Sequence, residues 1–132
     1  MVSYRTPLAR ARGLGAAKHG AGHWISERVT SIALVPLSLW AVCSGLTLAK
    51  VGYEGAAAWL HSPLNAVLAA LLLAVGFQHM HAGLRVVIDD YVHTNLSRSA
   101  LLLANLFVCA LGGALAIFCI LKVALGPAAI PA

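Results

Sequence analysis

The chain has 132 residues, of which 61% are hydrophobic and only 10% are charged. Soluble domains carry about a quarter charged residues, so this composition argues against a water-facing surface and indicates lipid as the main solvent. The net charge is +5, but the positive residues gather near one end without interleaved aromatic side chains, which argues against nucleic-acid binding. No GxGxxG, Walker or nucleophile-elbow motif occurs, so the chain has no motif for binding a dinucleotide or flavin by itself.

Residues 1–25 form a basic, glycine-rich N-terminal segment. Its positive charges, with one more just beyond it, come from Arg5, Arg10, Arg12, Lys18 and Arg28. A secretory signal is the competing interpretation. The apolar run that follows is longer than the core of about 7–15 residues typical of a signal and has no clear cleavage site, so we interpret it as a retained first helix.

The rest of the sequence predicts an all-α membrane protein in which residues 1–132 form a single membrane-anchor domain. Three apolar stretches are long enough to cross a bilayer core of about 30 Å, and they cover 29–49, 64–88 and 100–125. Pro36 lies inside the first stretch and is expected to kink it. Asn95 or Ser97 is expected to cap the third helix.

The charges of the connecting segments predict the topology. The N-terminal segment and the second loop, 89–99, hold most of the Lys and Arg residues, whereas the first loop carries only Lys50 and the C-terminal side only Lys122. The positive-inside rule then places the N-terminus and the second loop in the cytoplasm or the mitochondrial matrix. The first loop and the C-terminus are expected outside.

Polar side chains interrupt the second half of the second span, at Gln78, His79, His81 and Arg85. Each would be costly against acyl chains. Polar residues at such depth usually face the interior of a helix bundle and mark a functional site.

His79 is flanked on one face of the predicted helix by two glycines, which have no side chains. Gly76 and Gly83 fall within about 60° of its direction on a helix of 3.6 residues per turn. Glycines let a bulky body approach closely, either a partner helix or the flat ring of a haem, and imidazole is a common axial ligand of haem iron. A simple hydrogen bond from His79 to a neighbouring helix is the alternative.

His81 points about 200° away from His79, so the two cannot hold one iron from the same side. We predict His79 as the ligand and His81 as a residue that hydrogen-bonds or contacts a haem propionate. The first and third spans contain no histidine, so a second axial ligand has to come from another chain. The cysteines form no C-x-x-C pair, and neither an iron–sulfur cluster nor a zinc site is expected in this chain.

One segment of the second span has the pattern H-x-x-x-G-x-x-x-x-x-x-D-Y. Its fixed positions are His79, Gly83, Asp90 and Tyr91. The pattern resembles the signature of the hydrophobic membrane-anchor subunit of succinate dehydrogenase (respiratory complex II), of the alphaproteobacterial and mitochondrial type. His23 and the pair Arg28-x-Thr30, just before the first span, also resemble that family.

The resemblance implies a second three-helix subunit, a cytochrome b subunit, that shares one haem b with this chain through one histidine from each. It implies an iron–sulfur subunit and a flavoprotein subunit, which hold the iron–sulfur clusters and FAD, so this chain is not catalytic alone. Ubiquinone is the implied electron acceptor. The implied location is the bacterial inner membrane or the mitochondrial inner membrane.

Together these arguments give the predicted sites. The predicted haem ligand is His79, and its pocket is supported by Gly76, Gly83, His81 and Arg28. The resemblance implies that the quinone is contacted by Tyr91, with Asp90 beside it. The chain departs from some relatives in having Asp89 beside Asp90, which leaves open which acid matters. The anchor of a quinol:fumarate reductase and a purely structural anchor without haem ligation are the alternative functions.

Overall fold

The computed structural model describes residues 6–13 and 20–127, and every regular element in these ranges is an α-helix. The helices are α1 (Pro7–Ala11), α2 (Gly20–Leu48), α3 (Gly52–Leu60), α4 (Pro63–Tyr91) and α5 (Asn95–Ala124). Three of them, α2, α4 and α5, are long and apolar enough to cross a membrane. The predicted all-α fold with three spans is therefore confirmed. Arg5 and Lys18 of the basic segment lie outside the described residues.

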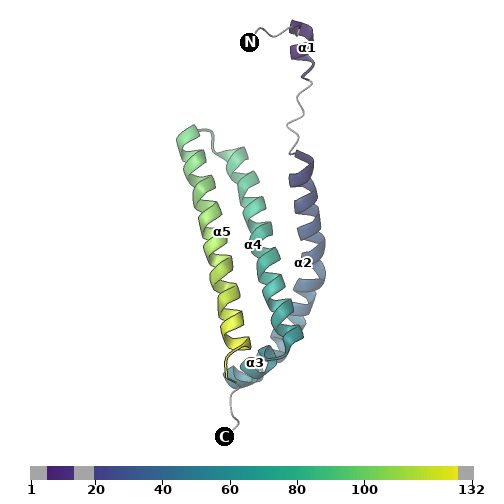
Figure 1. Cartoon of the computed structure of the whole chain (residues 1–132), viewed down its shortest axis with the longest axis vertical. Helices are drawn as coiled ribbons and strands as arrows, with labels where there is room; N and C mark the ends of the chain where they lie inside the picture. Colours follow the sequence, from purple (N-terminus) through teal and green to yellow (C-terminus); the bar gives the residue numbers. More distant parts are fainter. Residues whose placement is uncertain (1–5, 14–19, 128–132) are drawn as a thin grey trace.

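The three long helices lie in a row with α4 in the middle (Figure 1). Helix α4 packs against α5 on one side and against α2 on the other, whereas α2 and α5, as far as the structure describes them, do not pack against each other. Buried side chains are few among the described residues: Leu37, Ala57, Leu60, Ala66, Asn105 and Cys109. A row of helices with so small a core needs lipid or another protein against its broad faces.

The seam between α4 and α5 is shaped by one aromatic ring and two glycines. A Cβ atom added to Gly112 would lie 2.9 Å from the Phe77 ring, and one added to Gly113 would lie 3.3 Å from it. The ring of Phe77 thus occupies the space that side chains would fill at these positions. Small residues at membrane-helix interfaces allow this close approach of two backbones.

Helix α3 joins the ends of the three spans at one end of the row (Figure 1). The Trp59 ring stacks on Trp40 of α2 at a centroid distance of 5.6 Å. The backbone carbonyl of Trp59 accepts a hydrogen bond of 3.0 Å from the side-chain amide of Asn65 in α4. Nε2 of His61 lies 3.2 Å from the carbonyl oxygen of Gly126, just after α5. These contacts hold the three spans in register at this end.

Helix α2 begins at Gly20, earlier than the helix predicted over 29–49. The side chains of these additional turns interact within the helix. Nδ1 of His23 lies 3.6 Å from a carboxylate oxygen of Glu27, one turn later on the same helix. The apolar run therefore marks the part that can cross the membrane and not the whole helix. The same helix runs on through Pro36, and the expected kink stays a prediction.

The connection between α4 and α5 is shorter than the predicted loop 89–99. Helix α4 continues to Tyr91, and α5 begins at Asn95. The N-cap of α5 is Thr94, whose backbone is extended with φ −83° and ψ 125° and whose side chain makes no capping hydrogen bond. The prediction of Asn95 or Ser97 as the cap is wrong, because the chain turns helical before either of them.

The two ends of the row hold different segments. The start of α2 and the α4–α5 connection lie at one end, and α3 and the end of α5 lie at the other (Figure 1). This arrangement agrees with the prediction that the N-terminal part and the second loop share one side of the membrane. Which side that is stays a prediction from the charges.

Candidate functional site

His79 is held on the central helix of the row. Helix α4 starts with Pro63 at its first turn, where the missing N–H of proline costs nothing, and continues through a run rich in Leu and Ala. His79 lies in the second half of this helix and is half-buried. The contacts of its ring decide what it can bind.

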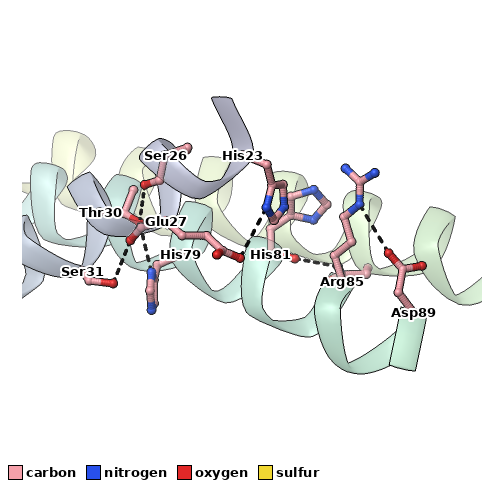
Figure 2. A network of polar contacts seen from close by, with 10 residues as sticks. His23, Ser26, Glu27, Thr30, Ser31, His79, His81, Arg85 and Asp89 are labelled. Atoms are coloured by element: carbon pink, nitrogen blue, oxygen red, sulfur yellow. Dashed lines mark hydrogen bonds and ion pairs between the residues drawn. The ribbon is translucent and has the colours of Figure 1, made fainter. Parts of the chain in front are cut away.

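A hydrogen bond joins His79 to the neighbouring span. Nδ1 of His79 lies 3.0 Å from Oγ1 of Thr30 on α2 (Figure 2). The same hydroxyl oxygen lies 2.9 Å from the carbonyl oxygen of Ser26 and 3.1 Å from that of Glu27. Nε2, on the other side of the ring, has no hydrogen-bond partner among the described residues, and Figure 2 shows it turned away from Thr30.

The predicted glycine face beside His79 is open. A Cβ atom added to Gly76 or to Gly83 would meet nothing within 4 Å. A hollow of about 280 Å³ lies at the first of these glycines, and its lining is almost entirely apolar: Leu72, Leu73, Gly76, Phe77 and Met80. The surface of α4 is therefore open at these two glycines, and the hollow at Gly76 lies close to His79 in sequence although His79 does not line it.

His81 belongs to the other side of α4, as predicted, and Figure 2 shows the rings of the two histidines pointing in different directions. Nδ1 of His81 is buried and has no hydrogen-bond partner among the described residues. The backbone carbonyl of His81 accepts a hydrogen bond of 3.0 Å from Asn105, whose own side-chain oxygen accepts one from Cys109. His81 thus contributes to the α4–α5 seam, and its expected contact with a propionate stays a prediction.

Arg28 lies on α2 two residues before Thr30 and is exposed. Its guanidinium lies 5.5 Å from the centre of the Trp24 ring, one turn earlier on the same helix. At 1.5 Å per residue, Arg28 is about 3 Å along the axis from Thr30 and points to a different side of α2. The structure therefore places Arg28 at the height of His79 without a contact between them.

The two neighbouring aspartates at the end of α4 have different surroundings. Asp89 Oδ1 accepts a hydrogen bond of 2.8 Å from Nε of Arg98 and forms an ion pair of 2.7 Å with Nη2 of the same side chain. Nε of Arg85 lies 3.9 Å from the other carboxylate oxygen. Asp90 is exposed and has no ion pair or hydrogen bond within the described ranges. Tyr91, the last residue of α4, is 79% exposed. Of the two acids, Asp90 is therefore the one that is available to an external group, together with the adjacent Tyr91.

Within the described residues there is no group of three or more His, Cys, Asp or Glu side chains that could hold a metal ion.

Two residues in these contacts had no role in the sequence-based prediction. Thr30 was noted only as part of a family pattern, and Asn105 was not noted at all. Their common signal is a polar side chain inside an apolar span, which usually hydrogen-bonds across to another helix.

Comparison with known proteins identifies the family. Residues 2–119 match the model of the succinate dehydrogenase/fumarate reductase transmembrane subunit. The chain belongs to this family. It is similar to the succinate dehydrogenase hydrophobic membrane anchor subunit of Paracoccus denitrificans, with 30% identity over 128 residues, 95% of this chain and 96% of the relative.

Two further members of the family are also similar. The proteins of that name from Rickettsia bellii and Rickettsia conorii are 33% and 30% identical over 103 and 110 residues. These matches cover 76% and 83% of this chain, and 81% and 87% of the relatives. No solved structure matches the chain at the same level of significance. The family and the three long apolar helices together show a multi-pass membrane protein.

Proposed function

We propose that this chain is the membrane-anchor subunit of a succinate:quinone oxidoreductase in a bacterial inner membrane. In this proposal Nε2 of His79 is one axial ligand of a haem b, and Tyr91 with Asp90 forms part of the ubiquinone site. The observation that carries the proposal is the state of His79, since one ring nitrogen is hydrogen-bonded to Thr30 and the other has no partner within the part of the chain that the structure describes. The names of the relatives support the anchor role.

The residues around His79 fit a haem. A bound haem b would supply a one-electron carrier inside the membrane. Nε2 is free to ligate iron, and the Cβ-free positions at Gly76 and Gly83 leave space for the ring beside it. The apolar hollow at Gly76 suits the porphyrin face, which is itself apolar.

The open row of helices supports an obligate partner. Neither α2 nor α5 offers a histidine within its apolar part to ligate the opposite side of an iron. A cytochrome b subunit with its own histidine would supply that ligand and cover a broad face of α4. An iron–sulfur subunit and a flavoprotein subunit, docked at the end that carries Tyr91, would hold the iron–sulfur clusters and FAD.

Tyr91 and Asp90 suit the reduction of a quinone. Reduction to the quinol requires two protons, so the site has to lie where protons can reach it. Tyr91 is about 18 Å from His79 along the axis of α4, at 1.5 Å per residue, which places it near the membrane surface. Its phenol O–H can donate one hydrogen bond to a quinone carbonyl. Asp90, exposed beside it, is available to pass protons from water.

Isolation of the complex from native membranes tests the proposal. We expect an affinity tag on this chain to retain the flavoprotein, the iron–sulfur subunit and the cytochrome b subunit, with succinate-dependent quinone reduction and a reduced haem b spectrum. A complex that contains the chain but no haem would contradict the haem part of the proposal and support the alternative of a purely structural anchor. Quinol-dependent fumarate reduction far exceeding succinate oxidation would indicate the fumarate reductase alternative.

A further inference from the structure

We infer that Thr30 is a positioning residue that fixes the tautomer and the ring orientation of His79, so that Nε2 presents its lone pair to iron. The inference rests on the proposed function, because it assigns Thr30 a role toward the haem that His79 would bind. It uses one relationship, the hydrogen bond of 3.0 Å between Oγ1 of Thr30 and Nδ1 of His79.

The direction of this hydrogen bond follows from the other neighbours of the hydroxyl. A threonine hydroxyl has one hydrogen to donate. Two carbonyl oxygens, of Ser26 and Glu27, lie 2.9 and 3.1 Å from Oγ1, and a carbonyl can only accept. We assign the hydroxyl hydrogen to one of these carbonyls, as for other threonines inside helices, so that an oxygen lone pair faces the imidazole and Nδ1 of His79 is the donor.

A neutral imidazole carries one hydrogen, so an Nδ1–H leaves Nε2 unprotonated. That is the form that can ligate iron. Two hydrogen bonds then follow each other, from Nδ1–H of His79 to Oγ1 of Thr30 and from the Thr30 hydroxyl to the Ser26 carbonyl. Every polar hydrogen of the two side chains has an acceptor. With no second partner on the ring among the described residues, the hydrogen bond to Thr30 alone sets which nitrogen is free.

The same bond sets the ring plane and the basicity of the ligand. Ligating histidines usually donate their second N–H to a carboxylate, carbonyl or water, which orients the ring and makes it a stronger donor to the metal. Here a hydroxyl on the adjacent span takes that role. Thr30 and His79 also come from different helices, so the packing of α2 against α4 controls the geometry of the ligand.

The test replaces Thr30 in the intact complex and measures the haem itself. Thr30→Val keeps the shape of the side chain and removes the acceptor, whereas Thr30→Ser keeps the hydroxyl. Thr47→Val is the matched control, because Thr47 makes the same kind of bond to the carbonyls of Cys43 and Ser44 on α2 but has no bond to a histidine in the described structure.

We expect Thr30→Val to weaken haem retention in detergent about 10- to 100-fold. We also expect it to raise the haem midpoint potential, since a less basic ligand favours the ferrous iron, and to alter the low-spin ferric EPR signal. Thr30→Ser and Thr47→Val should match the unmodified complex.

Each outcome decides one question. Haem retention, potential and EPR signal unchanged in Thr30→Val would overturn the role of Thr30, as would equal changes in Thr30→Val and Thr47→Val. A His79→Ala complex that keeps a normal haem b would instead overturn the proposed function. The two failures are therefore distinguishable.

Discussion

Arg98 on the first turns of α5 binds Asp89 near the end of α4 through two contacts, of 2.7 and 2.8 Å to the same carboxylate oxygen. The pair closes the short connection between these helices and occupies one of the two adjacent acids. Asp90 is left exposed beside Tyr91. Asp90, which is not paired within the described part of the chain, is therefore the acid that we expect to act at the quinone site.

Exchanging each acid for its amide separates these roles. We expect Asp90→Asn to lower succinate-to-quinone activity because the exposed carboxylate no longer carries protons to the site. We expect Asp89→Asn to leave that activity largely unchanged and to lower the free energy of unfolding by about 0.2–1 kcal/mol, as for other partly exposed ion pairs. Quinone reductase assays and thermal unfolding of the purified complex measure the two effects. The reverse pattern would assign the quinone site to Asp89.

Tyr91→Phe tests the phenol directly. Loss of one hydrogen bond costs about 0.5–1.5 kcal/mol, so we expect quinone reduction to slow by about 2- to 10-fold. Succinate oxidation by an artificial dye that accepts electrons from the other subunits should not change. Tyr53→Phe is the control, because Tyr53 is similarly exposed, at 80%, but lies on α3 at the other end of the row. Equal quinone kinetics in the two variants would remove Tyr91 from the site.

The seam between α4 and α5 predicts a packing defect at Gly112. A Cβ atom there would lie 2.9 Å from the Phe77 ring, so Gly112→Ala should destabilise the anchor by about 1–3 kcal/mol, as overpacking does in other cores. Gly45→Ala on α2 is the control, since its Cβ would meet nothing within 4 Å. Thermal unfolding of the complex in detergent measures both. A Gly112→Ala variant as stable as Gly45→Ala would contradict the described packing.

The topology is tested by reporters fused to this chain. We expect a reporter that is active only outside the cytoplasm to give signal at the C-terminus and none when inserted after Val92, in the α4–α5 connection. The physical reason is the excess of Lys and Arg at the end of the row that carries this connection. Activity after Val92 and none at the C-terminus would reverse the predicted orientation. Activity at both places would show that α5 does not cross the membrane.

The sequence predicted the three spans correctly because crossing a bilayer sets a length of apolar residues that no soluble helix needs. The helices extend beyond the predicted bounds, to Gly20 and Tyr91, because helical hydrogen bonding does not stop where an apolar run stops. The sequence also separated His79 from His81 correctly, since two residues at this spacing on one helix always point apart by about 200°.

The partner of His79 could not be predicted in the same way. Helix α2 is apolar around most of its circumference, so the sequence carries little information on which side faces α4. Whether Thr30 meets His79 depends on the rotation of α2 about its axis and on its shift along α4. Both are fixed by contacts distant in sequence, such as the stacking of Trp40 on Trp59.

The most direct test of the account is the reduced-minus-oxidised optical spectrum of the purified complex with His79→Ala, compared with His81→Ala. We expect the first variant to lose the haem b bands or to show them strongly altered, because one axial ligand is gone, while dye-linked succinate oxidation persists. The second variant should keep the bands, since the His81 ring lies toward α5 and away from the open glycine face. A normal spectrum in His79→Ala together with loss of the bands in His81→Ala would contradict the assignment of His79 as the iron ligand.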